Sequence, residues 1–510
     1  MDRILVLDFG GQYDLLIARR VREHHVFAEI KPYGKISAEE VKRGGYRGII
    51  FTGGPASVYA EGAPLCGADM LETGIPVLGI CYGAQLIAHL SGGEVSPAEG
   101  SGEYGSAALS VGKNALFEGI PEKITCWMSH SDRITSLPPG YTVTASTGKC
   151  PAAAFENSEK KIYGVQFHPE VSHTEYGRYV IGNFVKKICG ASGDWTMDGF
   201  TERSVRELRE KLEGRNVMLA LSGGVDSSVA AELLCRAVGD RLTCVFVDHG
   251  MLRKGESEAV VSVFGGRKDM NFIRVDAAER FLERLSGVTE PETKRRIIGE
   301  EFIRVFEETA KACGGSDVLA QGTIYPDVIE SGRGDSAVIK SHHNVGGLPG
   351  EMLFREICEP LRDLFKDEVR HVGELLGLPD PIVRRQPFPG PGLAVRITGR
   401  ISGDKLNTVR EADAIFREEV GKLPEEERPS QYFAVLTDTK SVGVKGDARA
   451  YGYTVALRAV DTDDFMTAGW SRLPYSLLET AAGRITGEIP QVTRVVYDIT
   501  SKPPATVEWE

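Results

Sequence analysis

Two segments of the chain place a glycine-bearing turn between a short apolar run and a helical pattern. The first is VLGICYGAQLIAHL at 77–90, and the second is NVMLALSGGVDSSVAAELL at 216–234. Apolar runs that are bounded by glycine are typical of buried parallel strands. Further strand-like runs at 4–10, 48–54 and 243–250 alternate with helical patterns. The alternation predicts an α/β fold that contains two doubly wound parallel sheets.

The length of the chain and two segments with the composition of linkers predict three domains. At roughly 150 residues per domain, 510 residues give about three domains that can each bury a core. The small, polar stretch CGASGDW at 189–195 marks the first boundary. The run RRQPFPGPGLAVR at 384–396 marks the second, because proline interrupts helix and strand alike. We expect domains at 1–191 and 192–385, followed by a smaller α+β domain at 386–510.

Composition restricts the class of protein. Hydrophobic residues make up 42% and charged residues 26%, which is typical of globular chains. The formal net charge of −12 argues against a nucleic-acid partner. The chain has 9 cysteines without a C-x-x-C pair, which favours a reducing compartment. The amino terminus does not resemble a signal peptide, and no apolar run is long enough to cross a bilayer. We expect a cytoplasmic protein without a membrane partner.

Cys81 stands at the first of the two turns. The small residues Gly79 and Gly83 allow a sharp turn, so that the cysteine side chain projects from the end of the strand, as in a nucleophile elbow. The amino end of the following helix favours the thiolate. The alternative is that Cys81 is a small buried hydrophobic residue, which is the usual role of a free cysteine.

A partner for the thiol follows in the segment YGVQFHPE at 163–170. His168 and Glu170 are two residues apart, and alternate residues of an extended segment face the same side. One side chain can therefore take the thiol proton while the other orients the imidazole. We predict a catalytic triad of Cys81, His168 and Glu170.

These residues resemble the class I glutamine amidotransferases, whose signature is G-x-C-x-G-x-Q with a distant H-P-E. The resemblance covers residues 1 to about 190 and implies that Cys81 attacks the glutamine amide, forming a glutamyl thioester and ammonia. It further implies an oxyanion hole and a contact to the bound glutamine, made by Gly53, Gly54, Tyr82 and Gln85. Two positions depart from the family pattern: Gly102 replaces a residue that is often basic, and H-S-D at 130–132 replaces H-G-D.

The second turn, S-G-G-V-D-S-S at 222–228, predicts a phosphate site. Serines and paired glycines at a helix start direct several backbone N–H groups to one point. Asp226 would repel a phosphate unless it holds Mg²⁺, which bridges to phosphate oxygens. The alternative is an ordinary capped helix start, since serine and aspartate are good caps.

This loop is similar to that of the N-type ATP pyrophosphatases, which adenylate a substrate oxygen and release pyrophosphate. The resemblance implies that ATP and Mg²⁺ are bound by the loop residues Ser222, Gly223, Gly224, Val225, Asp226, Ser227 and Ser228. Lys366 in LFKDEVR would reach the ATP phosphates, although a helix-surface lysine is an equally good interpretation. A glutaminase supplies a nitrogen nucleophile and an adenylating domain supplies an electrophile, so the two activities fit each other.

The acceptor is indicated by segments in the second half of the chain. GTIYPDVIES (322–331), KSHHNVGGLP (340–349), LFKDEVR (364–370), QPFPGPGL (386–393) and KPPATVEWE (502–510) resemble the bacterial GMP synthetase family. The resemblance implies xanthosine 5′-monophosphate (XMP) as acceptor, with its C2 oxygen adenylated and replaced by ammonia to give GMP, AMP and pyrophosphate. It also implies a homodimer formed through the last domain.

Residues for the XMP site follow from the same resemblance. They are Arg295, Asp447, Arg449, Lys502 and Glu508. A nucleoside monophosphate needs cationic donors for its phosphate and polar groups for its base. The alternative for each of these residues is a solvated or salt-bridged surface charge.

Two other functions remain open at this stage. A glutamine-dependent NAD synthetase shares adenylation and ammonia transfer, although its glutaminase is typically of the nitrilase type. A cysteine hydrolase joined to a nucleotide sensor would bind ATP without turnover. Pyrophosphate release that depends on XMP distinguishes both from the first interpretation.

Overall fold

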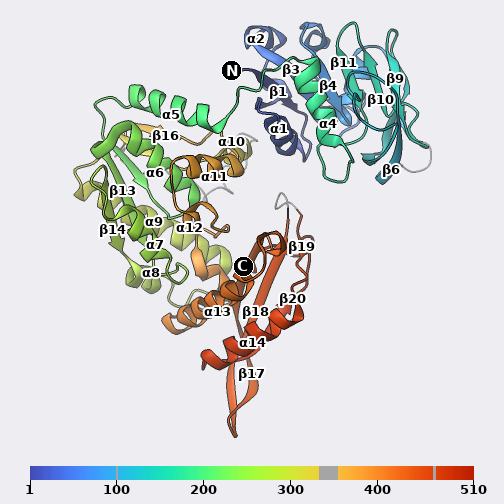
Figure 1. The fold of residues 1–510 in the computed structure, drawn as a ribbon. Coiled ribbons are helices and arrows are strands. Elements are labelled where there is room, and N and C mark those ends of the chain that lie inside the picture. Colours follow the sequence, from blue (N-terminus) through green and yellow to red (C-terminus); the bar gives the residue numbers. More distant parts are fainter. Residues whose placement is uncertain (99–101, 332–353, 463–466) are drawn as a thin grey trace. The chain divides into compact units, whose positions relative to one another are not determined.

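The computed structural model describes residues 1–510 except 99–101, 332–353 and 463–466 (Figure 1). The chain forms two compact units, Met1–Phe200 and Thr201–Glu510. The segment 340–349, which contributed to the sequence interpretation, lies outside the described residues. The boundary expected at 191 lies close to the end of the first unit, and the one expected at 386 lies within the second.

The first unit is built on a nine-stranded mixed sheet in the order β2-β1-β3-β4-β11-β10-β9-β6-β7. Its first five strands are parallel: β2 (Phe27–Pro32), β1 (Arg3–Asp8), β3 (Tyr46–Phe51), β4 (Val77–Ile80) and β11 (Ile162–Val165). The helices of this unit include α1 (Asp14–Arg22), α2 (Ala38–Arg43), α3 (Tyr82–Leu90) and α4 (Gly177–Gly182). The expected doubly wound parallel sheet is thus confirmed for this part of the unit.

The other four strands extend the sheet in antiparallel fashion, which the alternation of strand and helix did not predict. They are β10 (Ala154–Asn157), β9 (Thr142–Ser146), β6 (Glu103–Val111) and β7 (Lys123–His130). Buried and more exposed residues alternate along much of β6 and β7, as expected for antiparallel strands with one face toward solvent. A small two-stranded sheet joins β5 (Glu94–Pro97) to β8 (Asp132–Ser136).

The second unit begins with α5 (Met197–Lys211), most of which belongs to it, and a parallel sheet in the order β14-β13-β12-β15-β16. The strands are β12 (Val217–Ala220), β13 (Leu242–Asp248), β14 (Asn271–Asp276), β15 (Val318–Ala320) and β16 (Glu356–Cys358). Helices α6 (Val225–Val238), α7 (Glu256–Phe264), α8 (Ala278–Arg284), α9 (Pro291–Ala312), α10 (Tyr325–Ser331), α11 (Lys366–Leu375) and α12 (Asp380–Val383) accompany it. The second doubly wound sheet is therefore also confirmed.

The C-terminal part of this unit is α+β, as expected. A 3-10 helix at Gly392–Arg396 leads to α13 (Gly403–Gly421) and to the long hairpin of β17 (Gln431–Lys445) and β18 (Ala448–Asp461). Then follow β19 (Gly469–Trp470), α14 (Tyr475–Glu488) and β20 (Val492–Asp498), which pairs with β18. Figure 1 shows the end of the hairpin projecting beyond α13 and α14.

One hydrophobic core joins the two parts of the second unit. Val245 and Phe281 on the parallel-sheet side belong to the same buried cluster as Leu393, Val409 and Leu457 on the C-terminal side. A continuous core across residue 386 holds the two parts together. The division into domains at 192–385 and 386–510 stays a prediction.

Candidate active sites

The thiol of Cys81 lies at a strained turn between β4 and α3. The backbone of Cys81 has φ 52° and ψ −107°, a conformation that residues other than glycine rarely adopt. The flanking glycines are required by close backbone approach. A Cβ on Gly79 would lie 2.5 Å from the carbonyl carbon of Gly83, and one on Gly83 would lie 2.4 Å from Phe51 O. The geometry is that of a nucleophile elbow.

His168 and Glu170 meet on the segment that follows β11. His168 Nδ1 lies 2.7 Å from Glu170 Oε1, and the Glu170 side chain is fully buried. Burial by itself lowers the pKa of His168, but the Glu170 carboxylate and a hydrogen bond with Cys81 outweigh it, so this pKa is well above its ordinary value. The imidazole is thereby prepared to hold the proton that leaves the thiol.

The turn that contains Gly53 and Gly54 lies against this pair. A Cβ on Gly53 would lie 3.5 Å from His168 Cε1 and 3.8 Å from Cys81 Cβ, and one on Gly54 would lie 3.2 Å from Tyr82 Cγ. Tyr82 is buried, donates its hydroxyl to Pro64 O at 2.8 Å, and has a pKa raised to about 12 by burial. The residues expected around the oxyanion are therefore neighbours of the thiol.

Gln85 occupies the first turn of α3 and is held by the protein itself. Its Nε2 donates to Asp132 O at 3.0 Å and to Gln166 Oε1 at 3.2 Å. Gln166 in turn donates from Nε2 to Cys81 Sγ at 3.7 Å. The sequence interpretation did not single out Gln166, which directly follows β11 and lies two residues before His168.

The two departures from the family pattern lie together beside this network. A Cβ on Gly102 would lie 2.2 Å from His130 O and 2.8 Å from the Cα of Ser131, so a larger residue does not fit without movement. The Asp132 carboxylate accepts hydrogen bonds from Ser57 and from Tyr59, the latter at 2.9 Å. The segment 130–132 is thus fixed next to Gln85.

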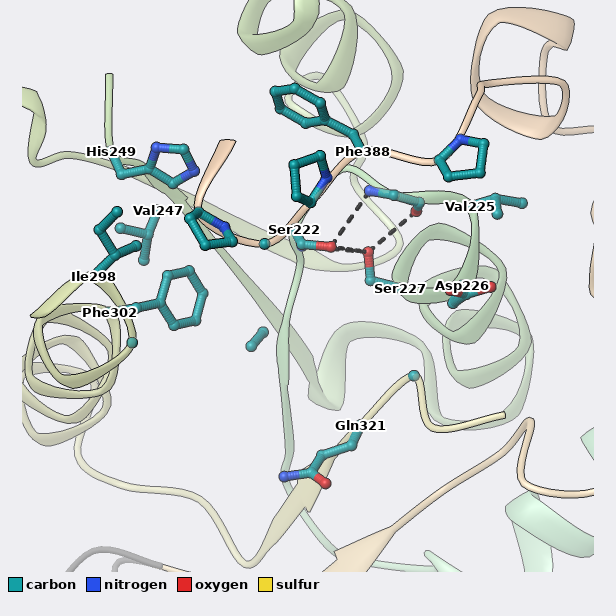
Figure 2. Close-up of a pocket in the computed structure, with 18 of the residues that line it drawn as sticks. Ser222, Val225, Asp226, Ser227, Val247, His249, Ile298, Phe302, Gln321 and Phe388 are labelled. Carbon is teal, nitrogen blue, oxygen red and sulfur yellow. Dashed lines mark hydrogen bonds between the residues drawn. The ribbon is translucent and has the colours of Figure 1, made fainter. Parts of the chain in front are cut away.

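The second candidate site is the turn after β12. Gly223 has φ +75°, in the left-handed region that favours glycine. The amide and the hydroxyl of Ser222 contact Ser227 Oγ at 3.2 and 3.1 Å, and Gly224 N donates to Ser222 Oγ at 3.4 Å. Figure 2 draws the contact between the two hydroxyl groups and the bond donated to Ser222 Oγ. Together these bonds hold the loop in a turn at the amino end of α6.

A cavity of about 340 Å³ opens at this loop and gathers most of the residues that were predicted for ATP. Figure 2 shows the loop on one side and His249, Ile298 and Phe302 on the other. Predicted residues that line the cavity are Ser222, Gly224, Val225, Asp226, Ser227, Lys366 and Arg295. Gly223 does not line it, and Ser228 is fully buried beneath the loop.

Asp226 and Lys366 are direct partners in the lining of the cavity. Lys366 Nζ, at the start of α11, lies 2.6 Å from Asp226 Oδ2, whereas Asp226 Oδ1 is buried without a hydrogen-bond partner. A carboxylate oxygen that lacks a partner suits Mg²⁺, which commonly binds one or two carboxylates together with substrate phosphates. Among the described residues no cluster of three or more ligating side chains occurs.

The wall of the cavity includes residues that were not among the predicted site residues, although some lie in segments that the family resemblance rests on. Gln386–Pro391, where the sequence predicts a domain boundary, line the cavity together with Arg385, His249 and Asp327. Three prolines in this segment fix its φ angles, which makes it a rigid wall. The three closely spaced prolines were the sequence signal that could have identified this wall. Arg385 donates to Gly223 O and so also supports the loop.

The residues predicted for XMP are dispersed within the second unit. Arg295 lines the cavity, but Asp447 and Arg449 are exposed at the end of the β17–β18 hairpin. Lys502 pairs through its backbone with Ala468, its N–H donating at 2.8 Å. Glu508 accepts from the fully buried Arg396 at 2.9 and 3.1 Å. The structure thus brings Arg295 alone of the five to the cavity, and the XMP assignments stay predictions.

Comparison with known proteins covers the whole chain. Residues 5–188 match the glutamine amidotransferase class-I family, and residues 418–509 match the GMP synthase C-terminal domain family. A glutamine-hydrolysing GMP synthase from Acetivibrio thermocellus is 59% identical over 508 residues, 99% of either chain. The enzyme of that name from Caldicellulosiruptor saccharolyticus is 58% identical with the same coverage. A solved glutamine amidotransferase from Thermotoga maritima is 21% identical, covering 41% of this chain and 84% of its own, with a TM-score of 0.27.

Proposed function

This chain belongs to the glutamine-hydrolysing GMP synthase family, and on that basis we propose how its two sites divide the reaction. The first unit hydrolyses glutamine with Cys81, His168 and Glu170. The second unit binds ATP in the 340 Å³ cavity and adenylates XMP. Membership of the family sets aside the NAD synthetase and the nucleotide sensor as alternatives. The observation that carries the proposal is that one chain holds both a complete Cys-His-Glu arrangement and a phosphate-loop cavity.

In the first unit, Cys81 Sγ attacks the amide carbon of glutamine and His168 receives the thiol proton. Glu170 stabilises the resulting imidazolium through its 2.7 Å contact with Nδ1. His168 then returns the proton to the departing ammonia, and the glutamyl thioester remains. Water cleaves the thioester and releases glutamate. Backbone N–H groups near Gly53 and Tyr82 would stabilise the negative oxygen that forms at each addition.

In the second unit, backbone groups of the loop at 222–228 hold the ATP phosphates, and Lys366 moves from Asp226 to a phosphate oxygen. When bound, Mg²⁺ neutralises charge on the departing pyrophosphate, and Asp226 is the residue that would hold it. The C2 oxygen of XMP attacks the α-phosphate and expels pyrophosphate. Ammonia then displaces AMP from C2, which gives GMP.

We further propose a cytoplasmic homodimer. All nine cysteines are free thiols, as expected in a reducing compartment. Within the described residues, no helix has the length and apolar character needed to span a membrane. The hairpin exposes Val442, Val444 and Tyr451, with 55%, 75% and 70% of their surface accessible. An apolar group of this kind suits a self-complementary contact with a second copy of the chain.

Pyrophosphate release tests the adenylating half of the proposal. The protein, ATP and Mg²⁺ are incubated with XMP, with inosine monophosphate, or with no nucleotide acceptor, and without glutamine or ammonium. We expect release with XMP alone, because the acceptor oxygen must be adenylated before nitrogen is needed. Release at the same rate without XMP, or none with it, would contradict the assignment.

A further inference from the structure

The sulfur of Cys81 has a neighbour that the triad does not account for. Gln166 is buried, with 1% of its surface accessible, and its Nε2 lies 3.7 Å from Cys81 Sγ. Ser129 O is also 3.7 Å from the sulfur, but a carbonyl oxygen can only accept the thiol proton. Gln166 is therefore the side-chain amide that contacts the sulfur as a donor.

The orientation of the Gln166 amide is determined by the network around it. Gln85 Nε2 donates to two carbonyl-type oxygens, Asp132 O at 3.0 Å and Gln166 Oε1 at 3.2 Å. Since only the NH₂ end of an amide donates, Gln166 must turn its oxygen toward Gln85. Its own NH₂ group is then directed to the sulfur. Two buried amides thus connect the backbone of Asp132 to the reacting atom.

A neutral hydrogen-bond donor in this position interacts more strongly with the Cys81 thiolate than with the thiol. A hydrogen bond to a charged acceptor is roughly twice as strong as one between neutral groups, and burial strengthens it further. The bond therefore favours the thiolate over the thiol. The Gln166 amide cannot take up a proton at neutral pH, so Gln166 does not compete with His168 as the base.

We propose that Gln166 is a catalytic residue that stabilises the Cys81 thiolate, and that Gln85 is the positioning residue that orients it. This inference rests on the proposed role of Cys81 as nucleophile. The bond acts when the sulfur is charged, before attack on glutamine and again when the thioester breaks. In both steps the proton that leaves the thiol stays with His168 or the leaving group. Gln166 keeps both protons of its NH₂ group.

Four ionisable groups lie at the sulfur or behind the residues that contact it, and they must be considered with it. His168, with Glu170 behind it, contacts the sulfur directly. His130 lies near His168 and 3.7 Å from the Glu103 carboxylate, and burial is the main reason that the pKa of His130 is lowered. The test below leaves all four of these groups unchanged, so that a shift between variants reports Gln166.

Two substitutions separate hydrogen bonding from shape. Gln166→Met keeps the length of the side chain and removes the donor. Gln166→Glu keeps the shape and an acceptor for Gln85, but places a carboxylate against the sulfur. The rate of alkylation of Cys81 by iodoacetamide is measured from pH 5 to pH 10 in the full chain, by mass spectrometry of the peptide that contains Cys81.

We expect the rate of alkylation at pH 7 to fall about tenfold in Gln166→Met, because the thiolate loses one hydrogen bond. The pH of half-maximal rate should rise by about one unit and rise further in Gln166→Glu. Glutamine-dependent GMP formation should fall in parallel, whereas ammonium-dependent formation stays within twofold. Gln85→Met should shift the profile in the same direction by a smaller amount.

The matched control is Asn157→Asp, which makes the same amide-to-carboxylate change at another buried amide of the first unit. Asn157 Oδ1 accepts from Lys160 N at 3.0 Å, and this contact survives the change. An unchanged profile in Gln166→Glu, or an equal shift in Asn157→Asp, would overturn the inference. Failure of the Cys81 assignment would give a different result. If Cys81 were not the nucleophile, Cys81→Ala would keep glutamine-dependent activity.

Discussion

Lys366 Nζ lies 2.6 Å from Asp226 Oδ2, so a lysine at the start of α11 neutralises the one carboxylate of the phosphate loop. The two residues are 140 positions apart in the chain. Both line the same cavity and both are partly accessible, with 39% and 27% of their side chains exposed. A pair of this kind contributes little to stability. It is well placed to exchange partners when phosphates and Mg²⁺ arrive.

Removal of either partner should affect nucleotide use rather than folding. We expect Lys366→Met to raise the KM for ATP about tenfold, because one hydrogen bond to a charged phosphate is lost. Asp226→Asn should raise the Mg²⁺ concentration needed for half-maximal AMP formation by a larger factor. The measurement is AMP formation with ammonium as nitrogen source, titrated with ATP and with Mg²⁺. An unchanged KM in Lys366→Met would show that this lysine is only a surface residue.

Glu170→Gln should separate the two activities. The Glu170 carboxylate helps to raise the pKa of His168, so its loss leaves the imidazolium less stable when it holds the thiol proton. We expect glutamine-dependent kcat to fall about a hundredfold, the lower range for an impaired acid–base residue. Ammonium-dependent GMP formation is measured with the same preparation and should not change. A similar loss in both reactions would indicate damage to the fold instead.

The buried His249 predicts a dependence of stability on pH. Burial lowers its pKa from 6.5 to about 4. Below pH 6.5 the unfolded chain binds a proton that the folded chain does not, so the contribution of neutral His249 is complete above pH 6.5. It is lost as the pH falls toward 4, amounting to about 3 kcal/mol in all.

Urea unfolding of the full chain at pH 7.5 and pH 5 tests this expectation. His249→Asn should lose less stability between the two values than wild type does. The exposed His371 provides the control, since His371→Asn should retain the sensitivity of wild type. Equal acid sensitivity in wild type and His249→Asn would contradict the account.

Glu508 has a structural role beside the one predicted for XMP. Arg396 is completely buried and donates two hydrogen bonds to the Glu508 carboxylate. Asp413 Oδ1, at 3.6 Å, is a second carboxylate beside the guanidinium. Glu508→Ala leaves this guanidinium under-compensated, and we expect the free energy of unfolding to fall by about 3 kcal/mol. The control is Glu425→Ala, at an exposed glutamate that pairs with Arg384. This substitution should lower the free energy of unfolding by less than about 1 kcal/mol. A rise in the KM for XMP without loss of stability would instead favour direct contact with the nucleotide.

Local patterns predicted the elements that carry the chemistry. Glycines around Cys81 and within 222–228 identify turns at strand ends, because only a residue without a side chain fits the close approaches at Gly79 and Gly83. The period of an extended segment predicts that His168 pairs with Glu170, and the two side chains do meet, although residues 169 and 170 form a turn. These features depend on neighbours in sequence, which is why the sequence discloses them.

Contacts between distant segments were not predictable in the same way. Gln166, Gln85 and Asp132 come from three separate segments, and no spacing indicates that the two side-chain amides and the Asp132 carbonyl form one network. The wall at Gln386–Pro391 has the composition of a domain boundary, because proline and glycine also mark linkers. Similarly, Glu508 could not be paired with Arg396 from sequence, since a buried arginine carries no local signal.

The separation of two sites in one chain is tested most directly by Cys81→Ala. Wild type and variant are incubated with ATP, Mg²⁺ and XMP, supplied with either glutamine or ammonium, and GMP and AMP are measured. The account predicts that the variant makes no GMP from glutamine and makes it at the wild-type rate from ammonium. Glutamine-driven GMP formation by the variant would contradict the role of Cys81, and failure of both proteins with ammonium would contradict the assignment of the second unit.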